Sequence, residues 1–360
     1  MESRARAPFS LVRVNPLRQF SDHIPNLDGQ TVFVSGGTGS FGQRFLRELV
    51  SIAEPQRAIV FSRDELKQSE MAAALRAELP ADRFDRLRFF IGDVRDRERL
   101  MLATRNVDII IHAAALKQVP AAEYNPSECI HTNVLGAENI VWAALHNHVK
   151  QVIALSTDKA CNPINLYGAT KLASDKVMIA ANNLAGDIGT RFAVVRYGNV
   201  IGSRGSIVPL FRQLAAKGVA GVPITDPRMT RFWITLDQGV RFVLSCLGLM
   251  RGGEIFVPKI PSMRITDLAE TMLPGVPHEI IGIRPGEKLH EQMISQDDAR
   301  TTVELTDRYV IEPAFAQFPR KSFVTDGAGT PTPERFSYAS DSNQEWLTGD
   351  QILSMLEGCT

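Results

Sequence analysis

Short apolar runs alternate with segments of helical periodicity along the first part of the chain. The apolar runs lie at 31–35, 57–62, 86–93, 107–115, 150–157 and 191–200. Two segments that follow the first two runs, 41–52 and 64–79, repeat apolar residues with helical spacing. Runs that are apolar throughout are typical of strands covered by helices on both faces. The alternation predicts an α/β fold with a doubly wound parallel sheet and right-handed crossovers.

The pattern changes after Val200, where Pro, Gly and Arg become frequent. Loops that carry positive charge are what a smaller, substrate-facing lobe would show. We therefore expect an N-terminal extension (1–26), a larger domain (27–200, with 233–258 returning to it), a discontinuous C-terminal substrate lobe (201–232 and 259–345) and a C-terminal helix (346–360).

Composition narrows the classes of protein that fit this fold. Hydrophobic residues make up 44% of the 360 residues, enough for a substantial core. Lys and Arg balance Asp and Glu at 40 each, so the chain has no electrostatic footprint for nucleic acid. Residues 1–26 lack the apolar core of a signal peptide, and no stretch approaches the roughly 20 apolar residues of a membrane span. The four cysteines match no zinc spacing, so we expect no metal and reduced thiols in a cytoplasm.

A glycine-rich turn, SGGTGSFG at 35–42, separates the first strand from the first helix. Its glycines permit a tight turn and close approach of the backbone to a pyrophosphate, while the helix N-terminus offers free N–H groups. A turn without a ligand is the alternative, but the position between strand and helix favours a Rossmann-type dinucleotide site. Its cofactor-binding residues are expected to be Gly36, Thr38, Gly39, Ser40, Phe41 and Gly42.

The end of the second strand bears on which dinucleotide is bound. Ser62 and Arg63 end this strand, and Lys67 follows one helical turn later. An acidic residue here suits the ribose 2′-OH of NAD, whereas an arginine suits the 2′-phosphate of NADP. Asp64 comes one or two positions too late and is expected to cap the next helix. We predict NADP; a solvated surface charge is the alternative interpretation of Arg63.

Further cofactor contacts are expected where the third and fourth strands end. Asp93 follows the third strand, where a carboxylate can reach the adenine. Ala113 and Ala114 follow the fourth, and their small side chains would let a cofactor lie against the strand ends. Packing of helix against sheet explains the alanines equally well. Val94 and Val200 are assigned to the same surface.

A Tyr-x-x-x-Lys pair, Tyr167 and Lys171, lies on the predicted helix after the fifth strand. The i, i+4 spacing places both on one face, and a nearby ammonium group favours phenolate and lowers the tyrosine pKa. Thr157, Asp158 and Lys159 are expected at the carboxyl end of the fifth strand, where ligands bind in open α/β sheets. Simple carbonyl reduction needs no further acid–base pair. Asp158 and Lys159 therefore indicate a second proton transfer, with a surface ion pair as the alternative.

With these motifs the chain resembles the extended short-chain dehydrogenases/reductases, and within them the UDP-N-acetylglucosamine 4,6-dehydratases of the inverting, soluble type. The stretches that carry the resemblance include VSGGTGSFG, FSRDELKQSEM, HAAALKQVPAAEYNP, ALSTDKACNPINLYGATK, VVRYGNVIGSRGSIVP and IGIRPGEKLHE. They fall between about residues 30 and 300. Cys161 stands where relatives often carry a valine-like residue, but this difference removes no catalytic group.

The resemblance implies a reaction and a set of roles. UDP-N-acetylglucosamine would become UDP-2-acetamido-2,6-dideoxy-β-L-arabino-hex-4-ulose and water, with hydride passing from C4 to NADP⁺ and back to C6. Lys159 would be the C5 base, through a pKa depressed by burial and neighbouring cations, and Asp158 the C6 acid. Tyr167, Lys171 and Thr157 would form the redox site. The substrate pocket would include Lys117, which also approaches the cofactor, Asn199, Arg204, Thr225, Arg284 and Glu287. Such proteins form homo-oligomers, often hexamers.

Two other functions compete with this interpretation. A nucleotide-sugar 4-epimerase shares the fold but needs no acid–base pair for loss of water, so Asp158 and Lys159 argue against it. A non-catalytic NADP(H)-binding sensor or scaffold would have no use for Tyr167 and Lys171.

Overall fold

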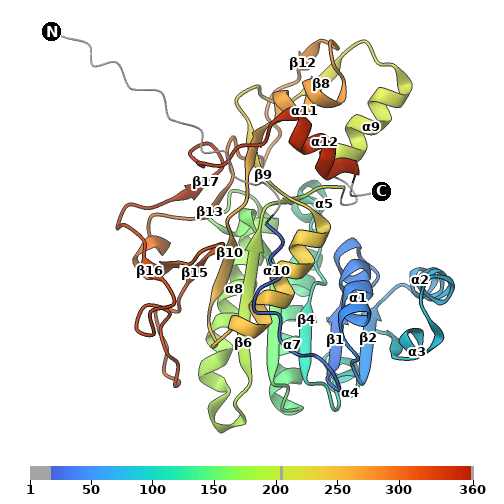
Figure 1. Ribbon diagram of the computed structural model, residues 1–360, viewed down its shortest axis with the longest axis vertical. Helices are drawn as coiled ribbons and strands as arrows, with labels where there is room; N and C mark the ends of the chain where they lie inside the picture. Colours follow the sequence, from blue (N-terminus) through green and yellow to red (C-terminus); the bar gives the residue numbers. More distant parts are fainter. Residues whose placement is uncertain (1–17, 203–205, 358–360) are drawn as a thin grey trace.

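The computed structural model describes residues 18–202 and 206–357. Its main feature is a ten-stranded sheet with the order β16-β14-β15-β10-β6-β5-β4-β1-β2-β3 (Figure 1). The parallel part comprises β1 (Thr31–Ser35), β2 (Arg57–Ser62), β3 (Leu87–Ile91), β4 (Ile109–His112), β5 (Gln151–Thr157), β6 (Arg191–Tyr197) and β10 (Ile255–Pro258). The α/β parallel sheet predicted from the apolar runs is confirmed.

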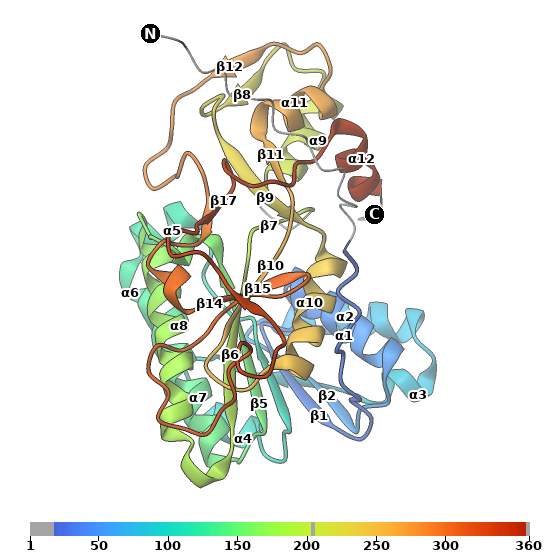
Figure 2. The same ribbon diagram turned by 60° about the vertical axis from the view of Figure 1, so that its left-hand side comes forward.

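Helices cover both faces of this sheet (Figure 2). One face carries α1 (Ser40–Ile52) and α10 (Leu236–Leu249), and the other carries α4 (Arg97–Ala103), α7 (Gly136–His146) and α8 (Leu166–Leu184). The central strands are apolar throughout because both of their faces lie under helices; β4, for example, is buried at every position. The remaining helices of this part are α2 (Glu65–Glu78), α3 (Ala81–Phe84), α5 (Val119–Tyr124), α6 (Pro126–Ile130), the π-helix η1 (His131–Leu135), and the 3₁₀ turns η2 (Asp158–Ala160), η3 (Gly186–Ile188) and η4 (Asp298–Thr301).

A smaller lobe lies beyond the carboxyl ends of the parallel strands (Figure 1). It has an apolar core of its own, which includes Phe211, Trp233, Leu268 and Ile352. Its elements are α9 (Ile207–Lys217), β8 (Val222–Ile224), β9 (Thr230–Ile234), β11 (Ser262–Arg264), α11 (Ile265–Met272), β12 (His278–Ile280) and α12 (Gly349–Glu357). A two-stranded sheet of β13 (Gln292–Ile294) and β17 (Tyr338–Ala339) lies beside it.

The strand predicted at 191–200 is divided in two. β6 ends at Tyr197, and β7 (Asn199–Val200) leaves the large sheet to pair with β9. Gly198 is the point of division, because a Cβ there would lie 2.6 Å from the Cβ of Phe232. The close approach of β9 therefore directs the chain from the large sheet into the lobe.

The range 259–345 does not belong wholly to the smaller lobe, as the sequence had suggested. β14 (Thr302–Glu304), β15 (Arg308–Ile311) and β16 (Thr330–Pro331) extend the large sheet, with β15 antiparallel to β10. Val303, Val310 and Phe323 join the large apolar core. The reason is tertiary, since these strands cover an edge of β10 that would otherwise be unpaired.

The described end of the N-terminal extension packs along α10. Phe20 is buried and meets Phe242 edge to face, with 4.9 Å between ring centroids. Ser245 Oγ donates a hydrogen bond to the carbonyl oxygen of Asp22. None of the helices in the described ranges is long and apolar enough to cross a membrane.

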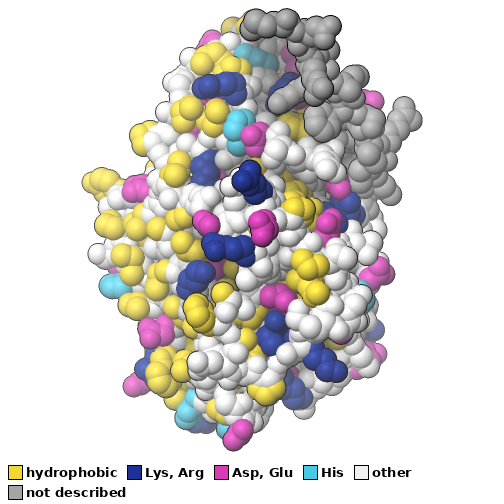
Figure 3. All heavy atoms as spheres, turned by 90° about the vertical axis from the view of Figure 1, so that its left-hand side faces the viewer, with side chains coloured by type: hydrophobic (Ala, Val, Ile, Leu, Met, Phe, Trp, Pro, Cys, Tyr) yellow, Lys and Arg dark blue, Asp and Glu magenta, His cyan; other side chains and the backbone are white. Residues whose placement is uncertain are grey.

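Apolar side chains also gather on the outside of the molecule. Figure 3 shows them along the left of the face it draws, which is the side where Figure 2 places α6, α7 and α8. Large exposed apolar residues on α5 and the next helices include Tyr124, Ile130, Leu135 and Trp142. Elsewhere on this face, basic and acidic side chains are interspersed.

Replacing Gly36 by alanine should destabilise the fold. Gly36 has a φ of +67°, and a Cβ there would lie 2.9 Å from the Cα of Ala114. The positive φ alone costs an alanine about 1–2 kcal/mol, and the contact with backbone adds to it. Urea unfolding should show a loss of at least about 2 kcal/mol for Gly36→Ala.

The matched control is Gly239→Ala in α10, where a Cβ meets nothing within 4 Å and φ is ordinary for a helix. This control should raise stability by about 0.5–1 kcal/mol. Equal unfolding midpoints for the two variants would contradict the close packing of Gly36 against the end of β4.

Candidate active site

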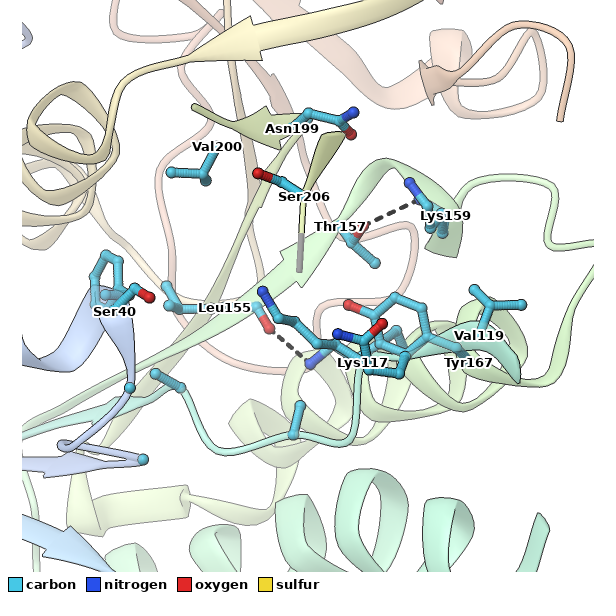
Figure 4. Close-up of a pocket in the computed structure, with 18 of the residues that line it drawn as sticks. Ser40, Lys117, Val119, Leu155, Thr157, Lys159, Tyr167, Asn199, Val200 and Ser206 are labelled. Atoms are coloured by element: carbon cyan, nitrogen blue, oxygen red, sulfur yellow. Dashed lines mark hydrogen bonds between the residues drawn. The ribbon is translucent and has the colours of Figure 1, made fainter. Parts of the chain in front are cut away.

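A cavity of about 1040 Å³ lies between the carboxyl ends of the parallel strands and the smaller lobe. Figure 4 places Ser40 at one end, Lys159 and Tyr167 at the other, and Asn199 and Val200 on a further wall. Most residues predicted for the site line this cavity: Gly36, Thr38, Gly39, Ser40, Phe41, Gly42, Ser62, Arg63, Lys67, Asp93, Val94, Ala113, Ala114, Lys117, Thr157, Lys159, Tyr167, Lys171, Asn199, Val200, Thr225, Arg284 and Glu287. Asp158 is buried and does not line it, and Arg204 lies outside the described residues.

The glycine-rich turn has the form of an anion site. Gly42 packs so closely on Gly37 that a Cβ would lie 2.6 Å from it, which brings α1 against the turn. Gly39 is the N-cap of α1, where no side chain caps the helix and no acidic residue lies in the first turn. The first N–H groups of α1 and the positive end of its dipole are therefore left for a ligand, which fits the pyrophosphate of a dinucleotide.

The end of β2 presents positive charge to the cavity. Asp64 is the N-cap of α2, as expected from the sequence, and accepts a hydrogen bond from the backbone N–H of Lys67. Arg63 is about half exposed, and its guanidinium lies 3.5 Å from a carboxylate oxygen of Asp93. Asp93 is itself held by Arg95 at 2.7 Å. Partial burial opposes ionisation of Asp93, but the hydrogen bonds from Arg95 outweigh it and lower the pKa.

Tyr167 and Lys171 lie together on α8, as the spacing predicted. Asn165 caps this helix, accepting from the N–H of Gly168, and also donates to the carbonyl oxygen of Gly286. Lys171 Nζ donates to the carbonyl oxygen of Leu155 at 2.6 Å, which ties α8 to the end of β5. The helix thus presents both side chains at the end of this strand.

The expected effect of Lys171 on Tyr167 is wrong for this arrangement. Burial raises the pKa of Tyr167 to about 12, and the ammonium group that opposes this rise belongs to Lys159, with help from the Thr157 hydroxyl. Lys171 instead engages a backbone carbonyl, and burial lowers its own pKa. The charge that favours phenolate therefore comes from Lys159 in η2, and a hydroxyl of β5 assists it.

Lys159 sits in a buried ion-pair group that the sequence did not predict. Its Nζ lies 3.1 Å from Asp158 Oδ1 and 3.0 Å from Glu291 Oε1. Burial alone would lower the pKa of Lys159, but the two carboxylates outweigh it and raise that pKa above its ordinary value. The predicted depression of this pKa is therefore wrong for the protein alone, because the nearest charges are carboxylates.

Asp158 lies behind Lys159 rather than in the cavity. Its Oδ1 accepts a hydrogen bond from Thr157 Oγ1 at 2.8 Å and lies next to Lys159 Nζ. Burial and the charge of Glu291 raise the pKa of Asp158, so this carboxyl group takes up a proton more readily than an ordinary aspartate does. The structure does not bring its carboxyl group to the cavity directly; contact with a substrate would pass through Lys159 or Thr157.

Two charged residues of the site were not predicted from the sequence. Glu291 follows the RPGEK segment, and Arg231 is a lone cation inside the apolar strand β9; both line the cavity. An arginine within an apolar strand could have indicated a charged site, since a buried charge needs a partner of opposite charge. Nothing in the local sequence identified Glu291 as that partner. Among the described residues, no cluster of His, Cys, Asp and Glu could hold a metal ion.

Curated relatives are similar to the chain over most of its length. A protein of Campylobacter jejuni subsp. jejuni (serotype O:23/36, strain 81-176), named UDP-N-acetylglucosamine 4,6-dehydratase (inverting), is 53% identical over 91% of this chain and 98% of its own length. A second protein of that name from another C. jejuni strain is 54% identical. A UDP-glucose 4-epimerase of Rickettsia canadensis is 42% identical over 78% of this chain and 82% of its own length.

Solved structures agree with the fold. The structure of Pen from Bacillus thuringiensis has a TM-score of 0.81 and 32% identity, covering 92% of this chain and 98% of that one. DesIV, a dTDP-glucose 4,6-dehydratase from Streptomyces venezuelae solved with NAD bound, has a TM-score of 0.63 and 26% identity, covering 72% of this chain and 87% of that one. Residues 32–313 match the family described as polysaccharide biosynthesis protein. The chain belongs to this family, and it has the extended short-chain dehydrogenase/reductase fold.

Proposed function

We propose that the chain is an inverting UDP-N-acetylglucosamine 4,6-dehydratase, which forms UDP-2-acetamido-2,6-dideoxy-β-L-arabino-hex-4-ulose and water. One observation carries the proposal: Lys159 and Tyr167 lie at one end of a cavity, and the glycine-rich turn lies at the other end of the same cavity. Oxidation at C4 requires a group like Tyr167, and loss of water requires a second acid–base group. Curated relatives more than 50% identical carry the same activity in their names.

The first step falls to Tyr167. A nicotinamide dinucleotide bound along the glycine turn supplies the acceptance and return of hydride. Tyr167 accepts the proton of the C4 hydroxyl, and Thr157 orients that hydroxyl. With a pKa of about 12 in the protein alone, the phenol depends on the charge of Lys159 and on further positive charge in the loaded site to reach its reactive form.

The second step falls to Lys159, with Asp158 behind it. Lys159 is proposed as the base for C5 and Asp158 as the source of the proton that leaves with the C6 hydroxyl. An ammonium group has no lone pair, so Lys159 must first pass a proton to Asp158 along the hydrogen bond between them, which leaves Lys159 as the free amine and Asp158 as the acid. The raised pKa of Asp158 fits a proton donor. Asp158 accepts a hydrogen bond from the Thr157 hydroxyl, so its proton can reach the C6 oxygen by relay: Thr157 gives its own proton to the leaving group and takes the one from Asp158.

The lobe is proposed to hold the UDP-sugar. Asn199, Thr225, Arg284 and Glu287 line the cavity on this side, and Lys117 lines it from the loop after β4. A guanidinium such as that of Arg284 suits a diphosphate because it carries a permanent charge and several donors. Arg204 is proposed to contact the UDP-sugar in the same pocket, and this proposal rests on the sequence alone.

NADP is the proposed dinucleotide. Arg63 and Lys67 both line the cavity at the end of β2. Asp64, which also lines it, caps α2 and pairs with Lys67, while Glu65 in the first turn of α2 does not line the cavity. With Asp64 engaged in this way, the half-exposed Arg63 guanidinium is the group proposed to meet a 2′-phosphate.

A homo-oligomer and a cytoplasmic location are proposed as well. The exposed apolar residues Tyr124, Ile130, Leu135 and Trp142 form a surface that a second copy of the chain would cover. The cysteines in the described ranges, Cys129, Cys161 and Cys246, are free and buried, as is common in a reducing compartment.

The proposed reaction predicts loss of water from UDP-N-acetylglucosamine. Mass spectrometry should show a product lighter by one water, without added reductant, because hydride is returned. In heavy water, NMR of the fresh product should show deuterium at C5 with inverted configuration. A product of unchanged mass would indicate an epimerase, and an unaltered substrate a non-catalytic protein. If the earliest product retains the configuration at C5, the inversion is contradicted but the loss of water is not.

Tyr167→Phe should bind UDP-N-acetylglucosamine but lose the first step. Without the phenol, a single turnover should form reduced nicotinamide about 10²–10⁴ times more slowly. Absorbance of the reduced nicotinamide measures this rate. The control Tyr309→Phe lies on β15, away from the cavity, and should react normally. Normal reduction by Tyr167→Phe would refute the assigned role.

Arg63→Asp should weaken NADP binding by about 10- to 100-fold while leaving NAD binding nearly unchanged, because a charged hydrogen bond is lost and a like charge faces the 2′-phosphate. Titration of both dinucleotides measures the ratio. Arg57→Asp, at the other end of β2, is the matched control and should alter neither affinity. Equal weakening of NADP and NAD by Arg63→Asp would show that Arg63 does not select the cofactor.

A further inference from the structure

Glu291 is a buried carboxylate at the cavity wall that no motif of the sequence singled out. Its side chain is 2% exposed, and its Oε1 lies 3.0 Å from Lys159 Nζ and 3.7 Å from Arg231 Nε. Among the described residues, its other oxygen, Oε2, has no hydrogen-bond partner. A buried carboxylate with one free oxygen is costly unless its charge serves a partner, and the nearest partner is Lys159.

The backbone of Glu291 is fixed from two sides. Its N–H donates to Ser340 Oγ at 2.9 Å, and the N–H of Ser340 donates to the Glu291 carbonyl oxygen at 2.8 Å. The Arg231 guanidinium donates to the carbonyl oxygens of Lys288 and Leu289, both at 3.1 Å, in the segment just before Glu291. The Glu291 carboxylate therefore has little conformational freedom, and the long side chain of Lys159 is restrained by its pair with this carboxylate.

The charges around Lys159 come from several elements. Asp158 in η2 and Glu291 are the anions, Arg231 from β9 is the opposing cation, and the phenol of Tyr167 approaches from α8. Burial would raise the pKa of Glu291, but Lys159 and Arg231 outweigh it and lower that pKa. Glu291 therefore stays ionised and is a fixed negative charge beside Lys159.

We propose that Glu291 is a positioning residue for Lys159: it holds the ammonium group at the sugar end of the cavity and sets how readily that group gives up its proton. This inference rests on the proposed dehydratase function. It assigns to Glu291 no contact with the reacting atoms, since its effect passes through Lys159. Asp158 alone, adjacent in sequence and hidden behind Lys159, restrains the side chain from one direction only; Glu291 supplies the second direction.

The test is Glu291→Gln, which keeps the shape and removes the charge. Loss of a carboxylate lowers the pKa of Lys159, so the limb of the dehydration pH profile that reports Lys159 should move to lower pH by about one to three units. The maximal rate of product formation should fall by about 10²-fold, because a misplaced group reacts slowly. KM should stay within about threefold of wild type, and nicotinamide reduction should fall less than dehydration, because Tyr167 needs only the nearby charge of Lys159.

Two further variants separate positioning from structure. Glu291→Asp keeps the charge but shortens the side chain. The limb of its dehydration pH profile that reports Lys159 should therefore stay near that of wild type, while its maximal rate of dehydration falls. Glu254→Gln is the matched control: Glu254 is also fully buried and paired with an arginine, Arg320, but lies away from the cavity. Arg320 keeps a second partner, Glu312, so this control should fold and react normally per folded molecule, with a lower melting temperature.

The measurements are single turnovers with UDP-N-acetylglucosamine across pH, followed by absorbance for reduction and mass spectrometry for loss of water. Thermal unfolding gives the folded fraction. An unshifted pH limb in Glu291→Gln, or an equal loss of both steps, overturns the inference. If Glu291→Gln does not fold, a displaced pH limb in Glu291→Asp overturns it instead. Wild-type protein that forms no dehydrated product contradicts the proposed function itself, which is a separate result.

Discussion

The position at which β5 ends governs the geometry of the active site. β5 pairs in parallel register with β4 on one side and β6 on the other, with Thr157 opposite Tyr197. After Thr157 the chain turns into η2, so Asp158 and Lys159 emerge at the edge where the parallel strands all end. α8 is fixed to the same point through Lys171 and the Leu155 carbonyl oxygen. The residues proposed for the redox step and those proposed for the acid–base step thus share one strand end.

Burial at this strand end sets the electrostatics. Water that would solvate charged groups is largely excluded, so each group responds to its neighbours rather than to solvent. Tyr167 is pushed toward the neutral phenol, and Lys159 is kept as an ammonium group by two carboxylates. In the proposed mechanism, neither is in its reactive form in the protein alone, and the charges of cofactor and substrate would complete the site.

The smaller lobe contributes more than a substrate surface. Thr230 at the start of β9 shares hydrogen bonds with His290 and Ser340, which joins β9, the segment before β13 and the residue after β17. Glu291 lies at this junction and reaches Lys159 across the cavity wall. Arg231 of β9 is thereby linked to Lys159 through Glu291, although β13 itself packs into the large core through Met293 and Ile294.

The sequence by itself determined the parts whose signals are local. Apolar runs gave the parallel strands, the glycine spacing gave the dinucleotide turn, and the i, i+4 spacing gave a helix face that carries Tyr167 and Lys171. Only the tertiary structure decided the electrostatic surroundings of Lys159, because Glu291 and its partner Arg231 come from segments distant along the chain. The same holds for Asp158, whose position behind Lys159 depends on the turn after β5, and for β14 to β16, which join the large sheet through pairing with β10 and one another. A pKa depends on burial and on charges within a few ångströms, and neither is a local property of sequence.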